Sequence, residues 1–187
     1  DEMLELFDPN NINKSASAYN EEKLLWLNSH YIKNASNERL VKDLKYFDCD
    51  LDDNNKKDDL LNLCKERAQT LVELKDAIAK FVDKPTSYEK KGSKKFVKEG
   101  TFEMLNNYMT LIEENNENLN SATDFENITK PFIEKYELKF PQIFQPIRIS
   151  LTGSTQAPSV YDIIAVLGIN ETCTRIRTAI EKNFDKE

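Results

Sequence analysis

Several residue types are scarce in this chain of 187 residues. It has one histidine, four glycines, three cysteines and five arginines, while lysine is plentiful. A single histidine, His30, excludes a metal site built on several imidazoles, and His30 falls within a helical pattern, so we expect a structural or surface role. Cys49, Cys64 and Cys173 are far apart and odd in number, which favours free thiols in a reducing compartment. We therefore expect a cytoplasmic protein.

Long apolar runs and an excess of basic charge are missing as well. No run approaches the ~18 apolar residues of a membrane span, and the formal net charge is −7. This balance argues against a broad DNA- or RNA-coating surface, although a local basic face is compatible with it. The one basic concentration, YEKKGSKKFVKEG at 88–100, is by default a solvated surface. We expect no membrane and no DNA partner, and a monomer.

No motif for self-sufficient catalysis is present. The chain lacks the phosphate-binding G-x-x-x-x-G-K-[ST] order and the G-x-S-x-G nucleophile turn. The acidic run at 48–53 lacks the glycine and closing glutamate of a calcium loop. We predict no catalytic residue and no metal ligand, and hence a binding module. Residue patterns alone leave open whether it binds RNA or another protein.

Helical periodicity dominates the chain, and no alternating strand pattern is found. Asn20 is a candidate N-cap for a helix over 20–33, in which we expect Trp26 and Asn28 to pack, and Thr70–Glu73 forms a capping box for another helix. Pro141 can start a later helix, and Gly168 can close a short one. The prediction is an all-α protein made of two consecutive small helical bundles, 21–92 and 93–187, preceded by a separate segment, 1–20.

Three stretches resemble one known family, the bacterial-type glutamyl-tRNA synthetases of class I. They are EKLLWLNSHYIK at 22–33, RAQTLVELKDAIAKF at 67–81 and QPIRISLTGSTQAPSVYDIIAVLG at 145–168, in the order in which the family has them. The resemblance implies the C-terminal anticodon-binding region, with 1–20 a remnant of the stem-contact segment. The H-I-G-H and K-M-S-K-S motifs of the catalytic half are absent from the chain. We therefore expect an inactive fragment of a glutamate–tRNA ligase that uses ATP and Mg²⁺, with no cofactor of its own.

The resemblance also implies which residues contact RNA. Arg67 would read the third anticodon base, and Arg148 would contact anticodon bases from within an apolar segment. The other implied contact residues are Gln145, Pro146, Ala157, Val160 and Lys130. The implied partner is tRNA(Glu), with tRNA(Gln) possible. Arg175 and Arg177 are expected to form a solvated or ion-paired helix face. The alternative is an all-α protein-interaction module without RNA binding.

Overall fold

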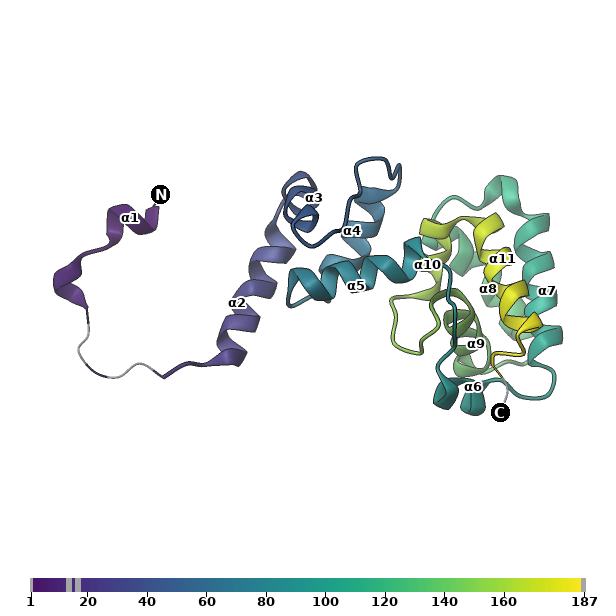
Figure 1. Cartoon of the computed structure of the whole chain (residues 1–187). Helices are drawn as coiled ribbons and strands as arrows, with labels where there is room; N and C mark the ends of the chain where they lie inside the picture. The colour runs from purple at the N-terminus through teal and green to yellow at the C-terminus, as the bar shows by residue number, and fades with distance from the viewer. Residues whose placement is uncertain (1, 13–14, 16–17, 186–187) are drawn as a thin grey trace.

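The computed structural model describes residues 2–12, 15 and 18–185, and within these it contains helices and no strand, as predicted. Figure 1 shows an N-terminal segment, a small helical unit and a larger helical unit in succession. The N-terminal segment holds α1 (Glu2–Leu6) and a 3-10 turn at Pro9–Asn11, which lie apart from both units. No helix among the described residues is long and apolar enough to cross a membrane.

The first unit contains α2 (Glu21–Asn34), α3 (Asn37–Lys45), α4 (Lys57–Lys65) and α5 (Leu71–Val82). Two predicted N-caps are confirmed: the side chain of Asn20 accepts from the Lys23 N–H, and that of Thr70 accepts from the Glu73 N–H. The second half of the predicted capping box differs, because the Glu73 carboxylate accepts from the N–H of Gln69 at 2.8 Å and not from that of Thr70. Such caps satisfy N–H groups that have no acceptor within the helix. Apolar faces of α3, α4 and α5 then meet around buried residues, among them Leu44, Leu61 and Leu74.

Helix α2 extends away from this core, and one prediction about it was wrong. Trp26 was expected to pack, but 65% of its surface is exposed, and its ring stacks on that of His30 in the same helix. Ile32 is the one buried residue of α2, so the apolar spacing of this helix does not correspond to burial. Asn28 is exposed as well, although its side-chain amide donates to the carbonyl of Gln69 and so ties α2 to the turn before α5.

The larger unit contains α6 (Lys90–Phe96), α7 (Thr101–Glu114), a 3-10 turn (Asn116–Asn118), α8 (Ala122–Lys135), α9 (Phe140–Thr152), α10 (Val160–Leu167) and α11 (Ile169–Glu181). Pro141 lies in the first turn of α9, and Gly168 closes α10, both as predicted. Helix α9 is central: it packs against α6, α7, α10 and α11, and Ile143, Ile147 and Leu151 are fully buried.

The division between the two units lies close to α6. The expected boundary between residues 92 and 93 falls inside this helix, which packs against α9. We propose that the boundary lies at 83–89, the segment that joins α5 to α6. The two units contact each other where α4 meets α10 and where α5 meets α9, and the candidate site lies along this junction.

Candidate nucleic-acid interface

An open cleft of about 580 Å³ lies between the two helical units. One side is formed by the end of α4 and the turn after it, the other by the start of α10 and the residues before α8. Its lining residues are Asp59, Asn62, Leu63, Glu66, Arg67, Asn120, Ala122, Pro158, Ser159, Asp162, Ala165 and Val166. A second cavity of about 250 Å³ adjoins it and shares Leu63, Arg67 and Pro158. Arg67 therefore lies between two hollows at the junction.

The turn between α4 and α5 positions Arg67. Its backbone N–H donates to the carbonyl of Cys64 at 3.2 Å, which continues the end of α4. Its exposed side chain crosses to the other unit, where Nη1 donates to the carbonyl of Ala157 at 3.1 Å. This is the only hydrogen bond of the Arg67 guanidinium among the described residues. A guanidinium carries five N–H donors and no acceptor, so most of its donors are left for a ligand in the cleft.

Arg148 reaches the same loop from α9. It is partly buried, and its Nε donates to the carbonyl of Pro158 at 3.3 Å, next to the carbonyl that Arg67 uses. Burial lowers the pKa of Arg148, and the positive charge of Arg67 lowers it further. The two guanidiniums thus hold consecutive carbonyls and bring hydrogen-bond donors together at one place. The cleft beside them is also lined by the carboxylates of Asp59, Glu66 and Asp162. Such a site suits a neutral group rich in acceptors, such as a nucleobase edge, better than a phosphate.

A short polar loop, 153–159, carries the two carbonyls and is held in place by hydrogen bonds to Glu89 at the start of α6. Gly153 ends α9 with a φ of 76°, a conformation that favours glycine. Glu89, which precedes α6, accepts from the N–H of Thr155 at 2.8 Å and from its hydroxyl at 2.7 Å. These hydrogen bonds, the one from the Thr155 N–H foremost, lower the pKa of Glu89. A charged carboxylate therefore holds the loop in position at neutral pH. The resemblance did not point to Glu89.

The remaining implied contact residues differ in how accessible they are. Pro146 and Val160 are buried as whole residues. Pro146 has no N–H, and its carbonyl accepts from the Ser150 hydroxyl at 2.8 Å. Val160 opens α10, where the first N–H groups have no acceptor within the helix. Gln145 is partly buried, and its Oε1 has no hydrogen-bond partner among the described residues. Lys130 is exposed on α8 and pairs with Glu126 at 3.0 Å; it is not among the residues that line the cleft.

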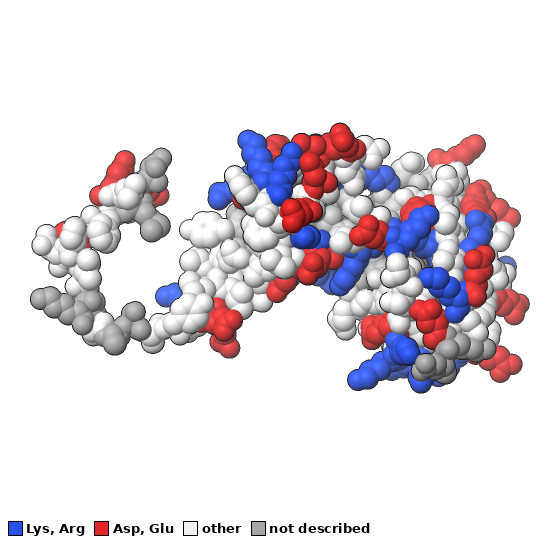
Figure 2. Space-filling model, viewed as in Figure 1, with Lys and Arg blue, Asp and Glu red and all other residues white. Residues whose placement is uncertain are grey.

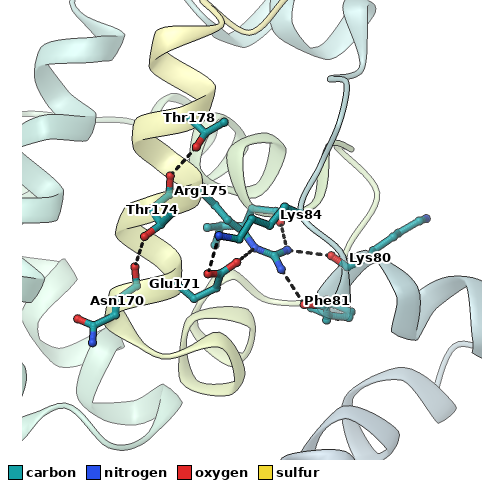
Figure 3. A network of polar contacts seen from close by, with 9 residues as sticks. Lys80, Phe81, Lys84, Asn170, Glu171, Thr174, Arg175 and Thr178 are labelled. Carbon is teal, nitrogen blue, oxygen red and sulfur yellow. Dashed lines mark hydrogen bonds and ion pairs between the residues drawn. The ribbon is translucent and has the colours of Figure 1, made fainter. Parts of the chain in front are cut away.

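Arg175 of α11 has a structural role that the sequence did not predict. Only 1% of its side chain is exposed, so the expectation of a solvated face was wrong, although its ion pair with Glu171 at 2.8 Å is present. The same guanidinium donates to the carbonyls of Lys80, Phe81 and Leu151 at 2.8–3.1 Å (Figure 3). It joins the last turn of α5 to the end of α9 and so holds the two units together beside the cleft. Arg177 is exposed and pairs with Glu113, as predicted.

Comparisons with known proteins agree with this arrangement. The model of the anticodon binding domain family matches residues 26–180. The chain is 62% identical over 183 residues to glutamate–tRNA ligase 1 of Aliarcobacter butzleri, which covers 98% of this chain and 39% of that protein. It is 44% identical over 181 residues to glutamate–tRNA ligase 2 of Campylobacter fetus subsp. fetus, with 97% and 39% covered. The chain thus spans about two fifths of the length of these relatives.

Solved structures show the same fold. A glutamate tRNA ligase from Elizabethkingia meningosepticum, crystallised in complex with its amino acid, aligns with a TM-score of 0.81 at 27% identity, covering 96% of this chain and 36% of that one. The glutamate-tRNA synthetase of Elizabethkingia anophelis aligns with a TM-score of 0.78. These similarities support anticodon recognition over the protein-interaction alternative. With the family model matching most of its length, the chain belongs to the anticodon binding domain family.

Proposed function

We propose that this chain recognises the anticodon of tRNA(Glu) and that Arg67 reads its third base. The observation that carries the proposal is the position of Arg67, exposed in the cleft between the units with a single hydrogen bond to Ala157. Arg148 and the loop at 153–159 stand beside it and can contact neighbouring bases. Gln145, Pro146, Val160 and Lys130 stay in the proposal as the further residues that the resemblance implies.

Hydrogen-bond chemistry explains why an arginine suits this task. A glutamate anticodon ends in C and a glutamine anticodon ends in G. The pairing edge of cytosine offers the acceptors O2 and N3, whereas that of guanine presents N–H donors. A guanidinium can only donate, so it matches cytosine and leaves the guanine donors unpaired. If the figure for base pairs in DNA applies, one such bidentate contact discriminates by about 1–3 kcal/mol.

The longer enzyme would attach glutamate to tRNA(Glu) with ATP and Mg²⁺ in the cytoplasm. The relatives are glutamate–tRNA ligases, and the chain covers about 39% of their length. We place the chemical step in the part of the enzyme that this chain does not span. Arg67 favours an enzyme restricted to tRNA(Glu) over one that also charges tRNA(Gln). We expect the chain to act as a monomer.

The test compares two anticodon stem-loops that differ only in C or G at the third anticodon base. Titration of the whole 187-residue chain at low salt should show a preference for C of about 5- to 150-fold, the range that 1–3 kcal/mol corresponds to. Arg67→Ala should abolish this preference. Arg39→Ala is the matched control, because Arg39 is exposed on α3 and pairs only locally with Asp43. Equal binding of both stem-loops by the unaltered chain would overturn the proposal.

A further inference from the structure

Positive charge is segregated at α6. Residues 90–98 contain five lysines and no acidic residue, a local charge of +5, while the whole chain carries −7. The rest of the chain therefore carries a net charge of −12. Figure 2 shows lysine and arginine side chains gathered at the lower edge of the molecule, where Figure 1 places α6. A basic patch on an acidic protein attracts a polyanion to that one place.

The packing of α6 turns the lysines outward. Its inward positions are small or apolar: Gly92 and Ser93 are buried, and Phe96 is partly buried. A Cβ at Gly92 would lie 2.5 Å from the side chain of Thr155, so α6 approaches the 153–159 loop as closely as only glycine allows. All five lysines of 90–98 are exposed. We call Lys94, Lys95 and Lys98, at the end of α6 and just after it, the basic face.

No carboxylate of the described residues pairs with the basic face, although Asp185 lines the same hollow as Lys94. Within the described residues, Lys94, Lys95 and Lys98 form no ion pair; Lys98 donates to the carbonyl of Lys94, and Lys95 lies over the ring of Phe96. The acidic residue just before the helix, Glu89, is committed to Thr155. The ammonium groups of the basic face are thus available to an external anion.

The basic face is also fixed to the loop that holds Arg67 and Arg148. The N–H of Glu89 donates to the carbonyl of Gly153 at 2.8 Å, and its carboxylate accepts from Thr155. These bonds join the start of α6 to the first half of the loop. The loop is thus attached to α6 at its first half, and its second half carries the Ala157 and Pro158 carbonyls that the two arginines hold.

We propose that Lys94, Lys95 and Lys98 bind backbone phosphates of the anticodon stem-loop, independently of its sequence. This inference rests on the proposed function, since it concerns the same RNA. Arginine in the cleft supplies base selectivity, and the basic face supplies affinity through release of counterions from the RNA. Lysine suits this task because an ammonium group on a flexible stem can follow a phosphate without fixed geometry.

The test measures affinity for the C-ending and G-ending stem-loops between 50 and 200 mM salt. The variant is Lys94→Gln, Lys95→Gln, Lys98→Gln in the whole chain, and the control is Lys23→Gln, Lys33→Gln, Lys42→Gln, which removes the same charge from exposed positions on α2 and α3. On single-stranded RNA, each phosphate that the protein neutralises contributes about 0.7 to the slope of log affinity against log salt. The α6 variant should therefore lower the slope by up to about 2 and leave the preference for C unchanged.

The outcomes separate this inference from the proposed function. The unaltered chain could prefer C while the α6 variant has the same salt slope and affinity as the control variant. In that case the basic face does not bind RNA, and it is either a solvated surface or a site for an acidic protein. If the unaltered chain binds neither stem-loop at low salt, both proposals are overturned. A melting temperature of the α6 variant equal to that of the control variant verifies that the fold is retained.

Discussion

Replacing Arg175 with methionine should destabilise the protein strongly, because the guanidinium is buried and fully used. It donates to the carbonyls of Lys80, Phe81 and Leu151 and forms an ion pair with Glu171. Methionine fills much of the same space but donates nothing. Three carbonyls therefore lose this donor, and Glu171 keeps only its ion pair with Lys84 at 3.5 Å. Two of these carbonyls end α5, and their loss should also loosen the junction between the two units.

The size of the effect depends on the groups that are left unpaired. Removing one partner of a buried ion pair costs about 3–5 kcal/mol. Glu171 is 30% exposed and retains Lys84, which reduces the cost of losing Arg175. The three unpaired carbonyls add to the cost, so the expected loss is about 3–5 kcal/mol. For a chain of this length, 1 kcal/mol shifts the melting temperature by about 2–4 °C. Arg175→Met should therefore lower it by about 6–20 °C.

Urea and thermal unfolding followed by circular dichroism measure this effect, and α11 itself offers the control. Arg177 is two residues further on, with 54% of its side chain exposed and its Glu113 partner 44% exposed. Exposed ion pairs contribute about 0–1 kcal/mol, so Arg177→Met should be nearly neutral. The reasoning is refuted if the two variants lose similar stability, or if Arg175→Met costs less than about 1 kcal/mol.

Two further predictions concern the loop at 153–159. Hydrogen bonds from the loop lower the pKa of Glu89 below the ordinary 4.5. The contribution of the Glu89 carboxylate to stability is therefore complete above pH 4.5 and is lost as the pH falls through the lowered pKa. Glu89→Gln should therefore lower the urea midpoint at pH 7, and the difference from the unaltered chain should shrink at pH 3; an equal difference at both pH values would contradict it. Gly153→Ala should cost about 1–3 kcal/mol, because a left-handed φ disfavours alanine and the new Cβ would lie 2.9 Å from the Ser87 carbonyl; a urea midpoint within error of the unaltered chain would refute it.

Caps and helix ends could be predicted because they depend on near neighbours. Asn20 and Thr70 accept from N–H groups three residues later, and Gly168 ends the helix immediately before it. Such contacts form whatever the rest of the chain does, so residue type and spacing suffice to identify them. The same reasoning failed at Trp26, because helical periodicity shows which residues share a face but not whether another element covers that face.

Arg67 and Arg148 could be identified from sequence only through the resemblance to a known family. Composition and spacing left their role open, since an arginine can equally close a helix end or an ion pair. The structure adds that both donate to adjacent carbonyls of one loop. It also limits the resemblance, because the side chains of Pro146 and Val160 are buried.

The sequence by itself determined the all-α class, the capped helices and the absence of known catalytic motifs, because these features lie in local residue order. The tertiary structure decided which polar groups form hydrogen bonds at the junction of the two units. Glu89 meets Thr155 across 66 positions, and Arg175 meets Phe81 across 94. Neither pairing leaves a local signal, since an isolated helix presents Glu89 or Arg175 to water as it would any other charged residue. Only the packing of α5, α6, α9 and α11 brings these groups together, and in doing so it holds the cleft around Arg67.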